Sequence, residues 1–359
     1  PEFLGLNGVL RRLNRTYRWA YSIRFINAKE ERIPMRILIT GITGRIGANL
    51  AAALVGQGHQ VRGLVWPRDP RTENLKPLGV ELIEGTITSE QDLTRAVEDM
   101  DVVYHLGAAF QGGGPFTDSE YFEINVRGTF NMLEAVRQTS SLRQLIFASS
   151  DALYDKYVPG GMEGSITEET PSQPRGAYAL SKELGENLCL GYARSYAVST
   201  TVLRFAMVRA ADEILSFPQF FLSEMRGSHR ELEDLWEGEE RLVLLRDALG
   251  RPFKKHIADV RDIVLGCLCA LDVERAFGQV YQLAGPSSFT WEEAALHLNK
   301  LLGIPIVDVE VGGVPTHYEF DLSKALREIN FNPQYGLGRM IEDAWSFKAG
   351  KMTDVLPHG

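Results

Sequence analysis

Two groups of residues in this sequence have the types and the spacing to carry out chemistry together. Tyr178 and Lys182 lie four residues apart in a segment typical of a helix, so both side chains would share one face. A tyrosine with a pKa of about 10 exchanges protons near neutrality only where the site lowers that value, and a nearby ammonium group does so. Ser150 follows an apolar, strand-like run and could hydrogen-bond a substrate oxygen on which charge develops. The pattern predicts proton exchange with a hydroxyl or carbonyl oxygen, although an isolated pair of this spacing is more often an ordinary helix surface.

Three glycines upstream predict where a dinucleotide would bind. Gly41, Gly44 and Gly47 follow the apolar residues 37–39 and precede a run of good helix formers. In this context the first glycine permits a tight turn, the second lets the backbone approach a pyrophosphate, and the third lets the helix pack close to the strand. The helix N-terminus would supply N–H groups and partial positive charge for the phosphates. A glycine turn without a ligand is the alternative, but the tyrosine–lysine pair downstream favours a nicotinamide dinucleotide that exchanges hydride beside the tyrosine.

The elements that must position these residues alternate along the chain. Predicted strands cover residues 37–39, 60–66, 80–85, 101–106, 145–150 and 200–205, and predicted helices cover 48–54, 90–97, 119–138 and 176–196. This alternation predicts an α/β fold with a doubly wound parallel, Rossmann-like sheet. The alternation stops near residue 210, so we expect a dinucleotide-binding domain at 35–210, with the strand-like residues 280–283 returning to it. Residues 211–350 are expected to form a smaller α+β substrate lobe, in which the apolar residues 214–225 are predicted to form a helix. Residues 1–34 are expected to be an extension such as a tag or leader.

The end of the second strand bears on the choice between NAD and NADP. A carboxylate there would bind a ribose 2′-hydroxyl, whereas an arginine would accept a 2′-phosphate. This strand ends in Val65-Trp66 without an acid, and Arg68 follows in a proline-bounded loop. The pattern favours NADP over NAD. Asp69 and the two prolines leave the path of the loop open, and Arg68 as a solvated surface charge is an equal alternative.

Composition excludes several other classes of function. The chain has 359 residues, enough for a full core, and its net charge of -9 argues against nucleic acid as the main partner. An odd, sparse set of three cysteines fits a reducing compartment, so a cytoplasmic location is expected. Cys267 and Cys269 are too few for a zinc site, and no metal is expected. No apolar run is long enough to span a bilayer, so no membrane partner is expected.

Several segments resemble one protein family. They are Thr-Gly-Ile-Thr-Gly-Arg-Ile-Gly at 40–47, His-Leu-Gly-Ala-Ala at 105–109, Asn-Val-Arg-Gly-Thr at 125–129, Ser-Ser-Asp-Ala-Leu-Tyr at 149–154, Tyr-Ala-Leu-Ser-Lys at 178–182 and His-Ile-Ala-Asp-Val at 256–260. From residue 35 to about 345 the chain thereby resembles an extended short-chain dehydrogenase/reductase of the NAD-dependent epimerase/dehydratase family. These motifs are highly specific for the family and weak for the substrate.

The resemblance implies roles for individual residues. Ser150, Tyr178 and Lys182 would be catalytic, and Asn125 would support the active-site helix or a water. The implied cofactor contacts, with Trp66 and Arg68 from the strand-end argument, are Gly41, Thr43, Gly44, Arg45, Ile46, Gly47, Trp66, Arg68, Thr86, Ile87, Leu106, Gly107, Ala108, Ala148, Tyr178, Lys182, Phe205 and Val208. The family commonly pairs the helices at 119–138 and 176–196 into a four-helix bundle, which implies a homodimer.

Three departures from the family pattern limit what it implies. Thr86 stands where the family often has an aspartate on the adenine, so adenine contact would fall to Thr86 or to the Ile87 backbone. Arg209 lies in a segment that differs from the family's substrate loop, and it could face the pocket. Ala152 replaces the glutamate that sugar-nucleotide dehydratases use to remove a proton, which argues against 4,6-dehydration.

Three functions remain open on the sequence. The first is an epimerase-like enzyme that exchanges hydride at a hydroxyl or carbonyl carbon of a sugar nucleotide or a similar hydroxylated substrate. The second is an NADPH-dependent carbonyl reductase with net redox, similar to dihydroflavonol reductases. The third is a sensor that binds the dinucleotide without turnover, and the intact serine, tyrosine and lysine argue against it.

Overall fold

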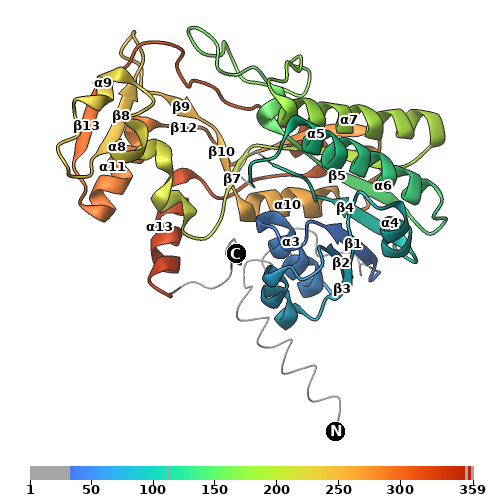
Figure 1. Ribbon diagram of the computed structural model, residues 1–359. Coiled ribbons are helices and arrows are strands. Elements are labelled where there is room, and N and C mark those ends of the chain that lie inside the picture. Colours follow the sequence, from blue (N-terminus) through green and yellow to red (C-terminus); the bar gives the residue numbers. More distant parts are fainter. Residues whose placement is uncertain (1–32, 111–113, 352–354, 357–359) are drawn as a thin grey trace.

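The computed structural model describes residues 33–110, 114–351 and 355–356, so nearly all of the predicted extension at 1–34 lies outside the described residues (Figure 1). Within the described part, seven parallel strands form one sheet in the order β11-β6-β5-β4-β1-β2-β3. The strands are β1 (Arg36–Thr40), β2 (Gln60–Val65), β3 (Glu81–Glu84), β4 (Val102–His105), β5 (Gln144–Ser150), β6 (Thr200–Phe205) and β11 (Gln279–Leu283). The strand order reverses between β1 and β4, where ligands bind at the carboxyl edge of such sheets. The predicted α/β, Rossmann-like fold is confirmed.

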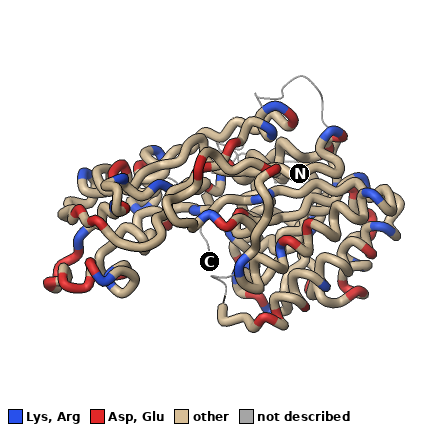
Figure 2. Tube along the Cα trace, turned by 90° about the horizontal axis from the view of Figure 1, so that it is seen from above, with Lys and Arg blue, Asp and Glu red and all other residues tan. Residues whose placement is uncertain are grey.

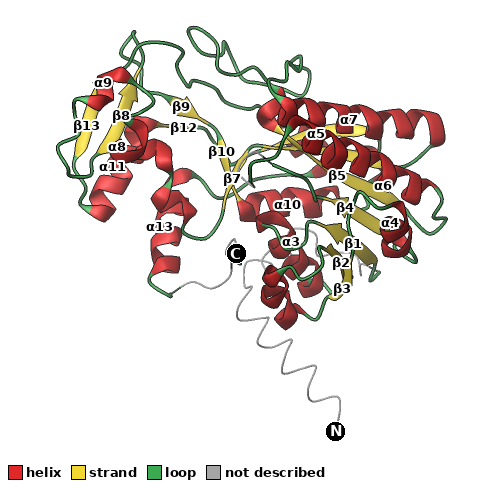
Figure 3. Ribbon diagram, in the orientation of Figure 1, coloured by secondary structure: helices red, strands yellow, loops and turns green. Residues whose placement is uncertain are grey.

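Helices cover both faces of this sheet (Figures 1 and 3). Helices α3 (Arg45–Gly56) and α10 (Val260–Ala270) share a core with Ile37 and Ile39 on one face. The core of the opposite face includes Leu38, and its helices are α4 (Glu90–Val97), α6 (Gly128–Arg137) and α7 (Ala177–Tyr196). Alternate residues of β1 therefore point into two different cores, which explains why its three central residues are all apolar.

A smaller lobe lies beside the carboxyl edge of the sheet. Its short strands pair as β7 (Met207–Arg209) with β10 (Ile257–Asp259), β9 (Lys254–Lys255) with β12 (Phe289–Thr290), and β8 (Leu242–Arg246) with β13 (Ile306–Glu310). The helices after β7, apart from α10, are α8 (Leu222–Met225), α9 (Arg230–Glu233), α11 (Trp291–Leu302), α12 (Ser323–Ile329) and α13 (Leu337–Lys348). The lobe has its own core around Phe220, Leu244 and Trp291, whereas α12 packs into the core of the sheet.

Two elements differ from the sequence predictions. The long helix expected at 119–138 starts as α5 (Asp118–Tyr121), widens into a π-helical segment at Phe122–Arg127 and continues as α6. The apolar residues 214–225 do not form one helix but two 3₁₀ turns, Glu213–Ser216 and Pro218–Phe220, followed by α8. Pro218 is the reason, because the residue before a proline is forced out of helical geometry, and Phe217 has an extended ψ of 112°.

Figure 2 shows lysines and arginines interspersed with aspartates and glutamates along both the sheet domain and the lobe. Among the described helices, none combines the length and the apolar character that crossing a bilayer requires. The same residues hold no cluster of three or more potential metal ligands.

Candidate active site

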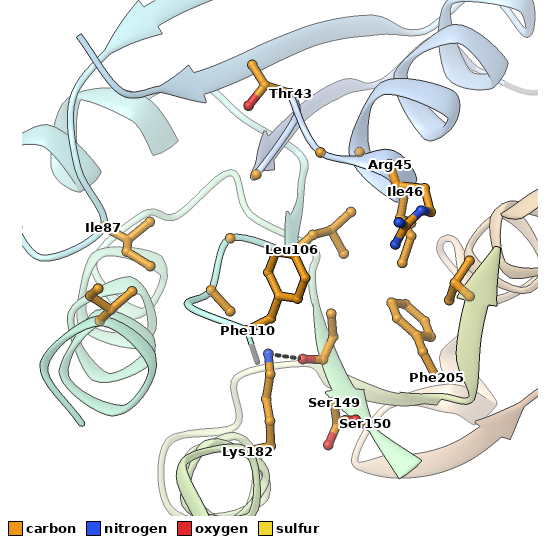
Figure 4. Close-up of a pocket in the computed structure, with 18 of the residues that line it drawn as sticks. Thr43, Arg45, Ile46, Ile87, Leu106, Phe110, Ser149, Ser150, Lys182 and Phe205 are labelled. Carbon is orange, nitrogen blue, oxygen red and sulfur yellow. Dashed lines mark hydrogen bonds between the residues drawn. The ribbon is translucent and has the colours of Figure 1, made fainter. Parts of the chain in front are cut away.

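A pocket of about 610 Å³ opens at the carboxyl edge of the sheet, between the sheet and the lobe. Its walls come from the glycine turn after β1, the ends of β2, β4 and β5, helix α7 and strand β7. Every residue predicted to be catalytic or to contact the cofactor lines this pocket except Arg68 and Asn125. In Figure 4, Thr43, Arg45 and Ile46 lie across the pocket from Ser150 and Lys182. One cavity therefore collects residues that are spread over more than 160 positions of the sequence.

The glycine turn has the shape that a pyrophosphate needs. Gly41 has a φ of 71°, and a Cβ there would lie 2.8 Å from the backbone nitrogen of Gly107. A Cβ on Gly47 would lie only 2.2 Å from the carbonyl oxygen of Gly41, so α3 could not pack this closely with a side chain there. Helix α3 begins at Arg45, and Gly44 before it has no side chain to cap the first amides. Arg45, Ile46 and Gly47 at the start of α3 line the pocket, and the turn thus fits a dinucleotide held by its phosphates.

An ionised carboxylate occupies the end of the pocket beside β2. Asp69 accepts hydrogen bonds from Thr43 Oγ1 at 2.9 Å and from Arg71 Nη2 at 2.7 Å, and all three residues line the pocket. The bonds from Arg71 and Thr43 hold the pKa of Asp69 at about 2, against the opposing effect of burial. Arg68, predicted at this place, is exposed and does not line the pocket. The chain turns left-handed at Arg68, with a φ of 60°, and this turn brings in Asp69 and Arg71 instead.

The catalytic end of the pocket holds Ser150, Tyr178 and Lys182 together. Lys182 Nζ donates a hydrogen bond to the carbonyl oxygen of Ala148 at 2.8 Å, as Figure 4 shows, and lies 5.2 Å from the centre of the Phe147 ring. Burial lowers the pKa of Lys182 to about 8. Burial also raises the pKa of Tyr178 to about 12, although a hydrogen bond with Ser150 opposes the increase.

The pKa of Tyr178 therefore shifts in the direction opposite to the one that the spacing predicted. The four-residue spacing predicted an ammonium that lowers the pKa of the phenol, but desolvation dominates and raises it. The negative charge of Asp151 raises this pKa further. Tyr178 consequently carries its proton at neutral pH, which suits it to donate that proton to an oxygen of the substrate.

Asn125 lies behind the pocket and positions the catalytic helix. It is buried in the π-helical segment, where its side-chain amide donates to Ser181 Oγ at 2.8 Å and to the carbonyl oxygen of Ala109 at 2.9 Å. Ser181 Oγ in turn donates to the backbone oxygen of Tyr178 at 2.7 Å. This chain of bonds ties the first turn of α7 to the strand end after β4, so Asn125 supports Tyr178 without lining the pocket.

Several lining residues were not assigned a role on the sequence. Ser149 and Asp151 flank Ser150 and could have been found from that motif; the Ser149 hydroxyl is buried without a hydrogen-bond partner among the described residues. Phe110 and Phe116 line the pocket at the two ends of a loop whose residues 111–113 lie outside the described part. Met207 contributes an apolar wall, and nothing in its sequence context distinguishes it from an ordinary core residue.

Comparison with known proteins identifies the fold and the family together. Residues 37–284 match the NAD dependent epimerase/dehydratase family, which is well over half of the chain. The chain belongs to this family. The match runs from β1 to the residue after β11, so it contains the glycine turn, Ser150, Tyr178 and Lys182. The protein is accordingly an enzyme of the NAD-dependent epimerase/dehydratase family, as the sequence motifs implied.

Individual members of the family show how similar the chain is to characterised proteins. A short-chain dehydrogenase/reductase superfamily protein from Agrobacterium tumefaciens, solved with bound NAD, superposes with a TM-score of 0.78 at 31% identity, covering 88% of this chain and 97% of that one. CDP-paratose 2-epimerase from Salmonella typhi is 30% identical over 343 residues, covering 84% of this chain and 95% of its own length. UDP-glucuronate 4-epimerase 3 from Arabidopsis thaliana is 25% identical over 360 residues, covering 90% and 80%.

Proposed function

We propose that this enzyme is an NAD-dependent epimerase that exchanges hydride at a hydroxyl-bearing carbon of a sugar nucleotide or a similar hydroxylated substrate. The observation that carries the proposal is the convergence of Ser150, Tyr178 and Lys182 with the glycine turn in one pocket. The names of two relatives, a CDP-paratose 2-epimerase and a UDP-glucuronate 4-epimerase, support a sugar nucleotide as the substrate. Their different reacting carbons leave the position of the reaction on the sugar open.

The residues of the pocket would have different roles in this reaction. A bound nicotinamide dinucleotide supplies the hydride acceptor and donor. Ser150 would hydrogen-bond the reacting oxygen, and Tyr178, which holds its proton at neutral pH, would return a proton to that oxygen when a carbonyl is reduced. Lys182, held against Ala148, would bind a ribose hydroxyl and add positive charge near the phenol. Phe205 and Val208 would exclude water from the reacting carbon.

A turnover experiment separates this proposal from the NADPH-dependent reductase. The purified enzyme is incubated with catalytic NAD and either UDP-glucuronate or UDP-glucose, and the sugar product and the absorbance of reduced nicotinamide are followed. The proposal expects an epimer without net accumulation of reduced nicotinamide. Stoichiometric consumption of NADPH with a carbonyl substrate, and no epimer from any sugar nucleotide, would support the reductase instead.

We propose further that the cofactor is NAD rather than NADP, contrary to the preference that Arg68 suggested. Asp69 is ionised at the end of the pocket beside β2, where its negative charge would repel a 2′-phosphate, and its bonds to Arg71 occupy the nearby guanidinium. Asp69→Asn is expected to raise the affinity for NADP relative to NAD at least about tenfold, because it removes one charge and frees Arg71. Titration of both dinucleotides by intrinsic fluorescence measures the ratio. Arg68→Gln is the matched control and should not change it; the reverse pattern in the two variants would refute this assignment.

We also propose that the two parts of the chain bind different ligands. We assign residues 35–210, with β11 paired to β6, to the dinucleotide and residues 211–350 to the substrate lobe. Helix α10 is an exception within the second range, because it packs against α3 in the core of the sheet. The reducing cytoplasm is the compartment we propose, on the cysteine usage alone.

A homodimer is the assembly that we expect for this enzyme. Large side chains stand exposed on the helices predicted to pair, and they are Phe122, Phe130, Leu180 and Tyr196. An apolar face of this kind is typical of a helix surface that a second copy covers. Light scattering at working concentration should give twice the chain mass, and a monomer mass would contradict the proposal.

A further inference from the structure

Arg209 places an unpaired positive charge in the wall of the pocket. It ends strand β7 and is half-buried. Its guanidinium approaches the carbonyl oxygen of Val208 at 3.3 Å and the sulfur of Met207 at 3.4 Å, and it stacks 4.5 Å from the centre of the Phe217 ring. No carboxylate of the described residues forms an ion pair with it. A guanidinium turned toward a cavity in this way has donors left for a ligand.

A second cation lies beside the same aromatic ring. Lys255 is fully buried, and its Nζ is 5.3 Å from the centre of Phe217. The polar partner recorded for Nζ is the neutral amide oxygen of Gln219 at 2.8 Å. Burial lowers the pKa of Lys255 to about 7; the charge of Asp151 opposes this decrease, and the charges of Lys156 and Arg209 add to it. A buried ammonium without a carboxylate is costly, so an anion bound nearby would stabilise its charged form.

The carboxylates in the neighbourhood are engaged elsewhere. Glu213 pairs with Arg45 at 2.5 Å and accepts a hydrogen bond from the Ala210 nitrogen at 2.8 Å. Asp151 pairs with Lys156 at 2.6 Å. Neither Arg209 nor Lys255 therefore forms an ion pair with a carboxylate of the described residues. Arg209, on β7, lines the pocket, whereas Lys255, on β9, does not line it and shares only the Phe217 ring with Arg209.

We propose that Arg209, assisted by the charge of Lys255, binds an anionic oxygen group of the substrate, either a carboxylate or a phosphate. The inference rests on the proposed function and deepens it, since it names the residue that would bind an anionic group of the substrate. A guanidinium pairs with both carboxylate and phosphate through parallel hydrogen bonds, so the shared chemistry is two adjacent anionic oxygens.

Binding to the full chain loaded with NAD tests this subsite independently of turnover. The probes are UDP-glucuronate, UDP-glucose and free glucuronate, titrated by calorimetry into the wild type and into Arg209→Gln. Arg209→Gln is expected to lower the affinity for at least one probe by about tenfold or more. Arg209→Lys, which keeps the charge, should retain part of the affinity. The control is Arg226→Gln, because Arg226 also stacks on an aromatic ring, 4.8 Å from the centre of Trp236, but does not line the pocket.

The pattern across the probes identifies the group that is bound. If Arg209→Gln lowers the affinity for both UDP-sugars alike, Arg209 binds a phosphate. If it lowers only the affinity for UDP-glucuronate and for free glucuronate, Arg209 binds a carboxylate. The proposal is overturned if no probe binds the wild type at millimolar concentration. It is also overturned if Arg209→Gln lowers the affinity for no probe by more than Arg226→Gln does. Either failure leaves the proposed hydride exchange untouched, since that is judged from product formation.

Discussion

Tyr178→Phe is expected to lower kcat by at least about 100-fold while NAD binds almost as tightly as in the wild type. In the proposed mechanism the phenol is the acid that returns a proton to the substrate oxygen, and the substitution removes its hydroxyl group. The ring stays in place through its edge contact with Tyr121, whose centre lies 6.0 Å away, so the pocket should keep its shape. Steady-state rates with a sugar nucleotide and a fluorescence titration with NAD give the two quantities.

Tyr196→Phe provides the control on the same helix. Tyr196 is exposed at the far end of α7 and packs against Tyr192 and Arg137, away from the pocket. Its loss of a hydroxyl should leave kcat unchanged. Equal rates for Tyr178→Phe and the wild type would remove the phenol from the mechanism, and only the dinucleotide fold would remain.

Gly47→Ala is expected to abolish detectable NAD binding. The new Cβ would lie 2.2 Å from the carbonyl oxygen of Gly41 and 2.7 Å from the Cα of Ile42, and both contacts are with backbone that cannot move aside cheaply. Helix α3 must therefore shift away from the turn, and the amides at its start leave the position that the phosphates require. Overpacking of this kind costs about 1–3 kcal/mol, so a lower melting temperature should accompany the loss.

Gly56→Ala separates the cofactor effect from a general change in α3. Gly56 ends the same helix, and a Cβ there meets nothing within 4 Å. Alanine should raise the free energy of unfolding by up to about 1 kcal/mol and leave NAD binding unchanged. Wild-type affinity for NAD in a folded Gly47→Ala protein would mean that the glycine turn is not the phosphate site.

The fold was predictable where the signal is local. Residues 37–39 and 145–148 are apolar because both faces of their strands are buried, and such runs are recognisable without knowing their partners. Strands β7 and β10 have three residues each and form only by pairing with each other, with Met207 opposite Ile257. No local sequence pattern predicts strands of this kind. The prediction of one helix at 214–225 was wrong because Pro218 interrupts the apolar run and forces Phe217 out of helical geometry.

The candidate site divides in the same way. The spacing of Tyr178 and Lys182 and the glycine turn are local, and the structure brings them into one pocket. The choice between Arg68 and the Asp69–Arg71 pair depends on a single left-handed residue, which the sequence does not specify. The pKa of Tyr178 depends on how deeply the phenol is buried, on its hydrogen bond with Ser150 and on the charge of Asp151, all of which come from the way other elements pack around it. Residue spacing carries no information about either.

The most direct test of the account follows the hydrogen on the reacting carbon. A sugar nucleotide that carries deuterium at the carbon to be inverted is incubated with the enzyme and catalytic NAD in ordinary water, and the product is examined by mass spectrometry and NMR. The account predicts an epimer that keeps the deuterium at that carbon, because the same hydride is removed and returned in one pocket. An epimer that has exchanged the deuterium for solvent hydrogen would contradict it.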